Sequence, residues 1–541
     1  MLCPELISAA SQHNSWRTYA TIRADKMSSV LDEVLERFEP SPEIVSVMAG
    51  TRPAIVLALD VGTSGVRAAM FDEHGREIPG ANVQNSRDIS TRSGFAEMDP
   101  EAALELVAQT IDDILALPHT DYSRIELVSI SCFWHSLMGI DSSGKATTPL
   151  LSWADTRSVL ITSQLRTRFN EQEIHARTGC RFHPSYWPAK ILWLQNERPD
   201  AFKETRYWLG FGEYLALRLF GYRGKSVSMA SATGLFNQHT RDWDQEFVRD
   251  LKISPETLPE LAFSNRTPHR LVERFAVRWR QLSEACLCPA IGDGAANNIG
   301  AGCLSRASVA LMVGTSGALR TLYEGEPPAR LSDALWSYRA DRTRVVVGGA
   351  LSDGGGLYHW LTEALALGEA SSDALQDSLA LMEPDAHGLT ILPFWAGERS
   401  TGWNPNARGA ILGLSVQTEP IDIVRAAMES VAYRFALILN ALDEIAPGAS
   451  IIAAGNALRS SPVWVQILAD VLNRPILLGS LREASTRGAA LLALEAAGKI
   501  QTIEEFLVPV ETAFEPDASR HERYQEGLAR QQEYYERVFT L

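Results

Sequence analysis

Short apolar runs that end at glycine are the clearest pattern in the chain. Residues 54–61 read AIVLALDV and stop at Gly62, which is the length and composition of a buried strand. The run VRAAMFD at 66–72 follows at once, so the pattern predicts two strands joined by a tight turn. The same strand–turn–strand pattern returns at 308–324, and both turns read Val-Gly-Thr-Ser-Gly.

Between and after these hairpins, apolar residues recur every three or four positions, which predicts helices. Asp99 and the proline after it predict a helix start, as does Ser461 with its following proline. The segment 420–442 is apolar on much of its surface and predicts a buried helix. The segment 484–498 predicts another helix, and 521–539 an exposed one. The chain therefore reads as α/β throughout, with a duplicated domain and a cleft between the halves.

Composition narrows the possible partners. The 541 residues carry a formal charge of −16, with 45% hydrophobic and 21% charged residues. Such a chain lacks the broad cationic surface that nucleic acids or anionic membranes require. It also has no uninterrupted apolar run of about 18 residues or more that predicts a membrane-spanning helix. We expect no nucleic-acid partner and no membrane partner.

The cysteines and the first 52 residues give only weak indications of location and fold. No cysteine pair has the spacing of a redox or zinc motif, which favours reduced core thiols and a cytoplasmic location. The first 52 residues lack the basic start and the apolar core of a secretory signal. We predict that residues 1–52 are a poorly ordered extension outside the fold.

The two glycine-rich turns predict a phosphate site. A Gly-Thr-Ser-Gly turn brings backbone N–H groups and hydroxyls close together, without side chains that would block an anion. The first turn offers Gly62, Thr63 and Ser64. Neither turn matches a Walker loop, a dinucleotide fingerprint or a nucleophile elbow. A pair of tight β-turns is the structural alternative, and a second copy after a second apolar strand favours the phosphate site.

The residues before the two turns differ. Asp60 precedes the first turn and supplies a hard oxygen ligand suited to Mg²⁺. Arg67, in the strand after that turn, is a fixed cation that can meet a phosphate. Met312 stands at the place of Asp60 in the second copy, and its side chain can neither bind Mg²⁺ nor meet a phosphate as a cation. The sequence predicts that one hairpin serves the metal and the other serves phosphate alone.

Seven motifs in a fixed order give the chain a resemblance to a known family. It resembles the FGGY carbohydrate kinases, within the actin, Hsp70 and hexokinase fold group. The motifs span about Ala54 to Gly498, and only the ordered set is specific. They are LDVGTSGVR, AIGDGAANNIGAG, LMVGTSGALR, GGALSDGGGLYHWL, PFWAGERSTGWNPNARG, AAGNALRSSPVWVQILADVL and EASTRGAALLA.

This resemblance implies a fold and a catalytic base. It implies two ribonuclease-H-like domains, at 53–303 for the sugar and 304–510 for the nucleotide, followed by a helical tail at 511–541. The general base is then Asp293 in the motif GDGAANN, which would also share the metal with Asp60. A carboxylate in this role accepts the proton of a sugar hydroxyl during attack on the γ-phosphoryl group. The small residues on both sides of Asp293 are expected to leave room for the substrate.

The resemblance also implies the ligands and their contacts. ATP and Mg²⁺ are the expected cofactors, with ATP contacts at Gly314, Thr315, Gly355 and Gly455. Asn456 replaces a second glycine at the last of these places, and asparagine tolerates a left-handed backbone better than most residues. We interpret the signature Gly-Glu-Arg at 397–399 as mainly structural.

The sugar-domain motifs resemble gluconokinases more than xylulokinases. Gluconate is an open-chain acid, so its site needs a cation or hydrogen-bond donors for a carboxylate. His135 has the best case for a sugar contact, because it follows a strand where the family places one. Trp134 stands where relatives commonly have methionine, and its ring is expected to reshape the pocket. The other substrate candidates are Asp155, Arg157 and His183, with Arg181 and Lys190 as further cations.

The leading hypothesis is therefore an ATP-dependent kinase that converts D-gluconate to 6-phosphogluconate. A xylulokinase or another pentulose or polyol kinase of the family is the alternative. A non-catalytic nucleotide-binding sensor is an alternative from another class, and loss of Asp60 or Asp293 would have favoured it. A small-molecule sugar or sugar acid is the expected partner. A homodimer is compatible with the sequence, which does not determine the oligomeric state.

Overall fold

The structure of the protein is a computed structural model. It describes residues 53–86, 96–118, 121–262, 264–365, 367, 372–454, 456–479, 483–506 and 508–539. The extension predicted at 1–52 and the nucleotide contact predicted at Gly455 lie outside the described residues.

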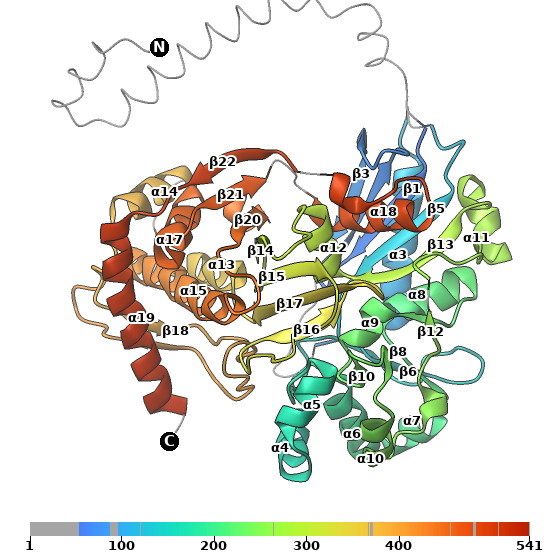
Figure 1. The fold of residues 1–541 in the computed structure, drawn as a ribbon, viewed down its shortest axis with the longest axis horizontal. Helices are drawn as coiled ribbons and strands as arrows, with labels where there is room; N and C mark the ends of the chain where they lie inside the picture. Colours follow the sequence, from blue (N-terminus) through green and yellow to red (C-terminus); the bar gives the residue numbers. More distant parts are fainter. Residues whose placement is uncertain are drawn as a thin grey trace, which may run out of the picture. The chain divides into compact units, whose positions relative to one another are not determined.

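The first hairpin lies at the centre of a five-stranded sheet with the order β13-β5-β1-β2-β3 (Figure 1). The apolar run that predicted a strand forms β1, whose six residues are all buried. β1 runs parallel to β5 and antiparallel to β2. The strands are β1 (Val56–Val61), β2 (Gly65–Phe71), β3 (Glu77–Ser86), β5 (Leu127–Cys132) and β13 (Cys286–Gly292).

The second hairpin lies in a seven-stranded sheet with the order β16-β17-β15-β14-β20-β21-β22. Its central strands repeat the first sheet: β14 runs parallel to β20 and antiparallel to β15, as β1 does with β5 and β2. The duplicated α/β architecture is thus confirmed. The strands are β14 (Ser308–Val313), β15 (Gly317–Glu324), β16 (Trp336–Arg339), β17 (Arg344–Leu351), β20 (Ser450–Ala454), β21 (Ile476–Gly479) and β22 (Val510–Phe514).

Helices cover both sheets, and their starts follow the predicted caps. The Asp99 carboxylate accepts the N–H groups of Glu101 and Ala102 at the start of α3, and Ser461 caps α17. Helix α15 is buried over most of its length, as predicted. These helices are α3 (Pro100–Leu115), α11 (Glu273–Arg278), α12 (Asp293–Gly300), α13 (Gly355–Ala364), α14 (Ser372–Leu381), α15 (Pro420–Leu442), α16 (Asn456–Arg459), α17 (Pro462–Leu472), α18 (Ala484–Ala496) and α19 (Ala518–Phe539).

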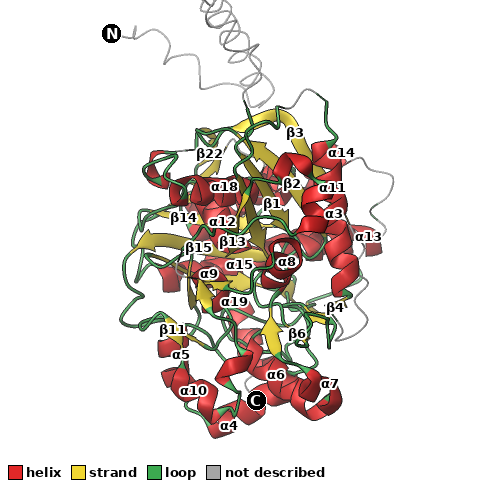
Figure 2. Cartoon of the chain, turned by 90° about the vertical axis from the view of Figure 1, so that its right-hand side faces the viewer, coloured by secondary structure: helices red, strands yellow, loops and turns green. Residues whose placement is uncertain are grey.

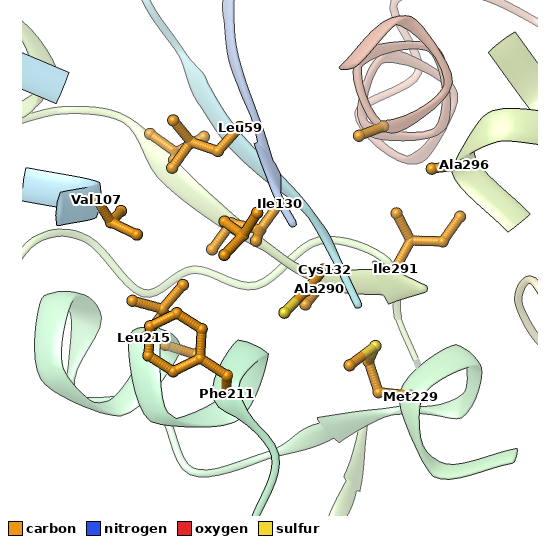
Figure 3. Close-up of a cluster of buried hydrophobic side chains, with 14 of the residues drawn as sticks. Leu59, Val107, Ile130, Cys132, Phe211, Leu215, Met229, Ala290, Ile291 and Ala296 are labelled. Carbon is orange, nitrogen blue, oxygen red and sulfur yellow. The ribbon is translucent and has the colours of Figure 1, made fainter. Parts of the chain in front are cut away.

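The main core lies between the first sheet and the helices beside it. Figure 3 shows Leu59 of β1 and Ile130 of β5 with Val107 of α3 and Phe211 of α8 (Phe211–Phe220) in this cluster. Helix α18, late in the sequence, also packs on the first sheet, where its Ala490 joins a cluster with residues of β1 and β5 (Figure 1). The two halves of the sequence therefore share a core.

A group of short elements between β5 and β13 carries a core of its own. Its helices are α4 (Val159–Arg168), α5 (Glu171–Thr178), α6 (Trp187–Glu197), α7 (Pro199–Glu204), α9 (Val227–Ser231) and α10 (Gln245–Asp250). Helices α4, α5, α6, α7 and α10 of this group gather at the lower end of the view in Figure 2. The strands of the group are β6 (Met138–Ile140), β7 (Leu150–Leu151), β8 (Tyr207–Leu209), β9 (Lys225–Ser226), β10 (Phe236–Asn237), β11 (Asp242–Trp243) and β12 (Leu261–Ala262). Elsewhere lie β4 (Glu97–Met98), β18 (Thr390–Leu392) and β19 (Ala410–Leu412).

The end of the chain differs from the prediction. Strand β22 extends the second sheet to Phe514, past the tail boundary expected at residue 510. Helix α19 is not exposed all round, because Tyr524, Leu528 and Gln531 are buried on one side of it. Arg425 of α15 donates a hydrogen bond to the Tyr524 hydroxyl at 2.7 Å, so this helix is tied to the second half. Among the described residues, no helix is long and apolar enough to span a membrane.

Candidate active site

The two Val-Gly-Thr-Ser-Gly hairpins have the same sequence but different registers. In the first, Val61 pairs with Val66; in the second, Val313 pairs with Gly317, which leaves a turn one residue shorter. A shift of one residue turns the following side chains to the other face of the strand. Arg67 therefore pairs across the hairpin with Asp60, whereas Met312 pairs with Ala318.

The first hairpin places Asp60 at the edge of the cleft. The buried Asp60 carboxylate accepts hydrogen bonds from the Ser131 hydroxyl at 2.7 Å and from Arg67 Nη1 at 3.3 Å. Burial raises the pKa of Asp60 despite these two partners. Arg67 Nε also lies 3.6 Å from the Glu483 carboxylate, just before α18. Among the described residues, nothing accepts a hydrogen bond from the N–H of Thr63 or Ser64, so both remain available to an anion.

The second hairpin is held by a run of glycines at the start of α13. The N–H of Gly355 donates to the Gly314 carbonyl at 2.7 Å, and that of Gly356 to the Thr315 carbonyl at 3.0 Å. A methyl group on Gly355 would lie 2.6 Å from the Gly314 oxygen, so only glycine fits there. Asn456 is the first residue of the adjoining α16. The structure thus brings Gly314, Thr315 and Gly355 together, with α16 beside them.

Asp293 lies where β13 ends and α12 begins. Its Oδ1 accepts the N–H of Gly294 at 2.8 Å, and no described residue donates a hydrogen bond to its Oδ2. Burial raises the pKa of Asp293 to about 6; Arg320 opposes that shift and the Asp60 charge adds to it. The Asp60 carboxylate therefore lies near enough to Asp293 for its charge to act on that group.

A pocket with a cavity volume of about 70 Å³ opens beside Asp293. Both halves of the chain line it: β16 of the second sheet contributes an aromatic pair, and Met312 lies among the lining residues. The aromatic wall consists of Trp134, Trp153, Tyr186, Trp336, Tyr338 and Trp403.

Trp134 corrects one expectation about the space around Asp293. A methyl group on Gly292 would lie 1.8 Å from the Trp134 indole, and one on Gly294 would lie 2.3 Å from Arg320 Nη1. The glycines therefore accommodate Trp134 and Arg320, and they do not leave room for the substrate. The indole is fixed by its N–H, which donates to the Ser228 carbonyl at 3.2 Å.

His135 lines the pocket as a neutral ring. Its backbone has a φ of 67°, a conformation uncommon outside glycine. Nδ1 lies 2.7 Å from the Ala232 carbonyl, which can only accept, so Nδ1 carries the proton and Nε2 is an acceptor. Burial lowers the pKa of His135 to about 3, so the ring carries no charge near neutral pH.

The other substrate candidates do not line the pocket. Arg157 forms ion pairs with Asp155 at 2.7 Å and with Glu97 at 2.6 Å. His183 lies behind the pocket wall, with its ring centroid 5.7 Å from that of Trp403. The structure therefore supplies neither a free cation nor a free acid from these three residues.

The two further cations are also committed elsewhere. Arg181 pairs with Glu171 at 3.1 Å and with Asp333 at 3.2 Å. The Lys190 ammonium donates to the carbonyls of His135 and Ser152, at 2.7 and 2.8 Å. Lys190 thus supports the strained His135 backbone from behind.

Two pocket arginines were missed by the sequence reasoning. Arg320 follows the second glycine-rich turn on β15, where the register turns it to the face of Met312. Arg399 belongs to the Gly-Glu-Arg signature, whose Glu398 does have a structural role, since it bonds to Arg434 at 2.5 Å and to Tyr535 at 2.6 Å. Its neighbour Arg399 lines the pocket. The only signal in the sequence was that both arginines lie within family motifs.

The raised pKa of Asp293 predicts a pH dependence. As pH falls through about 6, the carboxylate becomes protonated and can no longer accept a proton. We expect kcat/KM to be highest above that pH and to fall about tenfold per unit below it. A pH–rate profile with saturating ATP measures this. A rate that stays level down to pH 4.5 would contradict the assignment of Asp293 as the base.

Comparisons with known proteins agree with this geometry. Models of the N-terminal and C-terminal domains of the FGGY family of carbohydrate kinases match residues 55–300 and 309–497. The gluconokinase of Bacillus subtilis (strain 168) is 30% identical over 462 residues, which are 83% of this chain and 89% of that protein.

Solved structures of the same kind match the fold. The gluconate kinase from Lactobacillus acidophilus matches with a TM-score of 0.81 and 27% identity, covering 89% of this chain and 98% of that one. A ligand-bound xylulose kinase from the same organism gives the same four values. The predicted two-domain fold of the actin and hexokinase type is confirmed. The chain belongs to the FGGY family of carbohydrate kinases and is a phosphotransferase that acts on sugar hydroxyls.

Proposed function

We propose that the protein transfers the γ-phosphoryl group of ATP to the 6-hydroxyl of D-gluconate. The observation that carries this choice is the charge of the pocket. Its lining holds one acid, Asp293, and two arginines, Arg320 and Arg399, beside the neutral His135. A carboxylate on the substrate would balance the surplus positive charge, which a neutral sugar would leave unbalanced. The similarity to gluconokinases supports the same substrate.

Asp293 is the base in this proposal. Its Oδ2 accepts the proton of the 6-hydroxyl while that oxygen forms a bond to the γ-phosphorus. The bond from the γ-phosphorus to the β,γ-bridging oxygen breaks, and ADP leaves. Arg320 keeps Asp293 ionised by opposing the effect of burial on its pKa. The aromatic wall excludes water, which would otherwise compete with the sugar for the phosphoryl group.

The two hairpins hold the phosphates in this proposal. The free N–H groups of Thr63 and Ser64 belong to the turn that follows Asp60 and β1, and Gly314 and Thr315 lie on the other hairpin. Mg²⁺ would neutralise charge on the phosphate oxygens. Asp60 and Asp293 fit that ion, because both are carboxylates whose pKa burial raises, and a divalent cation offsets that cost. Arg67 remains beside Asp60, where it can follow a phosphate.

The five cysteines among the described residues are buried and unpaired, which supports a reducing compartment such as the cytoplasm.

A panel of acceptors tests the substrate. Purified protein with Mg-ATP is assayed for ADP release with D-gluconate, D-xylulose and glycerol, and the product is checked for phosphate at carbon 6. We expect kcat/KM for gluconate to exceed the others by about 100-fold or more. Xylulose is the second candidate, because a xylulose kinase matches the fold equally well. Faster turnover of xylulose would replace gluconate as the substrate.

A further inference from the structure

The last helix of the chain lies beyond the part that the family domains cover. The C-terminal family domain ends at residue 497, whereas α19 begins at Ala518 and ends at Phe539. Figure 1 shows α19 running past β18 of the second half. Because the end of a chain is poorly ordered unless it is tied down, the bonds that hold α19 indicate what the helix does.

Two tyrosine hydroxyls of α19 form hydrogen bonds with charged side chains of the second half. The buried Tyr524 accepts a hydrogen bond from Arg425 Nη2 of α15 at 2.7 Å. About three turns later, the half-buried Tyr535 donates to Glu398 Oε2 at 2.6 Å. The first bond joins two helices. The second bond reaches a loop that contributes Trp403 to the pocket lining.

The Glu398 carboxylate holds the turn that carries Trp403. Its Oε1 accepts the backbone N–H of Gly402 at 3.1 Å, and its Oε2 accepts that of Asn404 at 3.4 Å. These two residues flank Trp403 in the sequence. Trp403 has a φ of 53°, a left-handed conformation that persists outside glycine only where the surrounding structure supports it. The carboxylate supplies that support from both sides.

The Tyr535 hydroxyl fixes the plane of this carboxylate. Glu398 Oε1 is held by Arg434 Nη2 at 2.5 Å, whereas the short partner of Oε2 is Tyr535. The torsion that turns a carboxylate is soft, so loss of the second partner would let Oε2 move away from the Asn404 N–H. The helix and the turn are also in direct contact, because a methyl group on Gly402 would lie 2.1 Å from the Tyr535 hydroxyl.

Trp403 connects this turn to the sugar pocket. Its indole N–H donates to the Asp333 carbonyl at 3.0 Å, and its ring centroid lies 6.2 Å from that of Tyr186. Both rings line the pocket, and Tyr186 stands at the start of α6 in the first half. A displacement of Trp403 would therefore change the wall that the two halves build together.

We propose that Tyr535 is a positioning residue for the sugar pocket. Tyr535 does not line the pocket itself. It acts through Glu398, which holds the turn that presents Trp403. The C-terminal helix thus shapes the pocket from outside the family domains. This role concerns a wall of the pocket and not a contact with one functional group, so it holds for whichever sugar is the substrate.

The test is Tyr535→Phe, which removes the hydroxyl and keeps the ring that packs against Phe394 and Phe539, at centroid distances of 5.7 and 5.3 Å. We expect KM for the sugar to rise about tenfold, since a small displacement of a positioning group is costly. We expect kcat and KM for ATP to stay within about twofold, because Asp293 and the glycine-rich turns are untouched. The acceptor is D-gluconate, D-xylulose or glycerol, whichever the wild-type protein turns over with the highest kcat/KM.

Tyr524→Phe is the matched control. It makes the same change on the same helix, and its hydroxyl is also bonded to a charged side chain. Tyr524 is fully buried, so we expect the melting temperature to fall at least as far as in Tyr535→Phe. Its KM for the sugar should stay within about twofold of wild type. If both variants raise this KM equally, or if Tyr535→Phe leaves it unchanged, Tyr535 has only a structural role and the proposal is wrong.

A double variant tests the route through Trp403. Trp403→Phe should itself raise KM for the sugar. Adding Tyr535→Phe should then raise it by less than about a further twofold, because residues that act through one another are not additive. A further tenfold rise would show that Tyr535 acts by another route and would overturn the proposal. Failure of the wild-type protein to use gluconate would contradict the proposed function alone, since the preferred acceptor then serves in this test.

Discussion

Asp293→Asn is expected to lower kcat by about a thousandfold, within the range that a positioned general base contributes. Asparagine has the same shape, and its side-chain oxygen can still accept the N–H of Gly294, which Asp293 Oδ1 accepts at 2.8 Å. It cannot take the proton from the sugar hydroxyl, so the chemical step loses its acceptor while the pocket keeps its form. The measurement is ADP release under saturating ATP and gluconate.

Two observations separate loss of the base from loss of structure. ATP without Mg²⁺ should bind Asp293→Asn at least as well as wild type, because a negative charge near the phosphates is removed. Asp470→Asn is the matched control: this buried acid on α17 accepts hydrogen bonds from Gln466 and from the Asp517 N–H, away from the pocket. Its kcat should stay near wild type. Turnover by Asp293→Asn at a tenth of the wild-type rate or more would exclude Asp293 as the base.

Gly300→Ala is expected to lower the free energy of unfolding by about 3 kcal/mol. Helix α12 crosses α18 so closely that a methyl group on Gly300 would lie 1.7 Å from the Ala484 carbonyl oxygen, and one on Gly488 would lie 1.9 Å from the Ala296 oxygen. Both obstacles are backbone atoms, so no side chain can turn aside. Alanine favours a helix over glycine by only about 1 kcal/mol. The steric overlap therefore outweighs that gain.

The melting temperature by scanning calorimetry checks this prediction. Gly479→Ala is the control, because its new methyl group would meet only side-chain methyl groups, Val508 Cγ1 at 3.3 Å and Ile452 Cγ2 at 4.0 Å. We also expect Gly300→Ala to lose activity, since α12 begins at Asp293 and α18 follows Glu483, which lies near Arg67. A melting temperature equal to or above that of wild type would show that the two helices can separate without cost.

Much of the fold followed from the sequence because its signals are local. Apolar runs ending at glycine gave the two hairpins, and Asp99 and Ser461 gave two helix starts. Asp293 could be nominated as the base because its motif is a contiguous stretch, and that role stays a prediction. The nucleotide contacts Gly314, Thr315 and Gly355 lie together in the structure, and they stay a prediction until a nucleotide is bound.

The sequence could not predict which charged side chains of the pocket are ion-paired. Arg157 and Arg399 both lie in motifs next to a polar residue, so the local sequence does not distinguish them. The sequence predicted Arg157 as a contact for the sugar acid. The structure pairs Arg157 with Glu97, 60 residues away, and leaves Arg399 without an ion-pair partner among the described residues. Ion pairing depends on which distant segments meet, and no local pattern records that.

By itself, then, the sequence determined the strands, the two glycine-rich turns and the acids Asp60 and Asp293, since each depends on neighbours within a few residues. Only the tertiary structure decided that the identical turns differ in register, that Trp134 fills the space at Gly292, and that β16 completes the pocket. The tertiary structure also decided which cation of the pocket has no ion-pair partner among the described residues and can therefore meet a charged substrate. These features arise where segments far apart in the chain exclude one another's atoms or neutralise one another's charges, and the free energy of such contacts depends on distance in space.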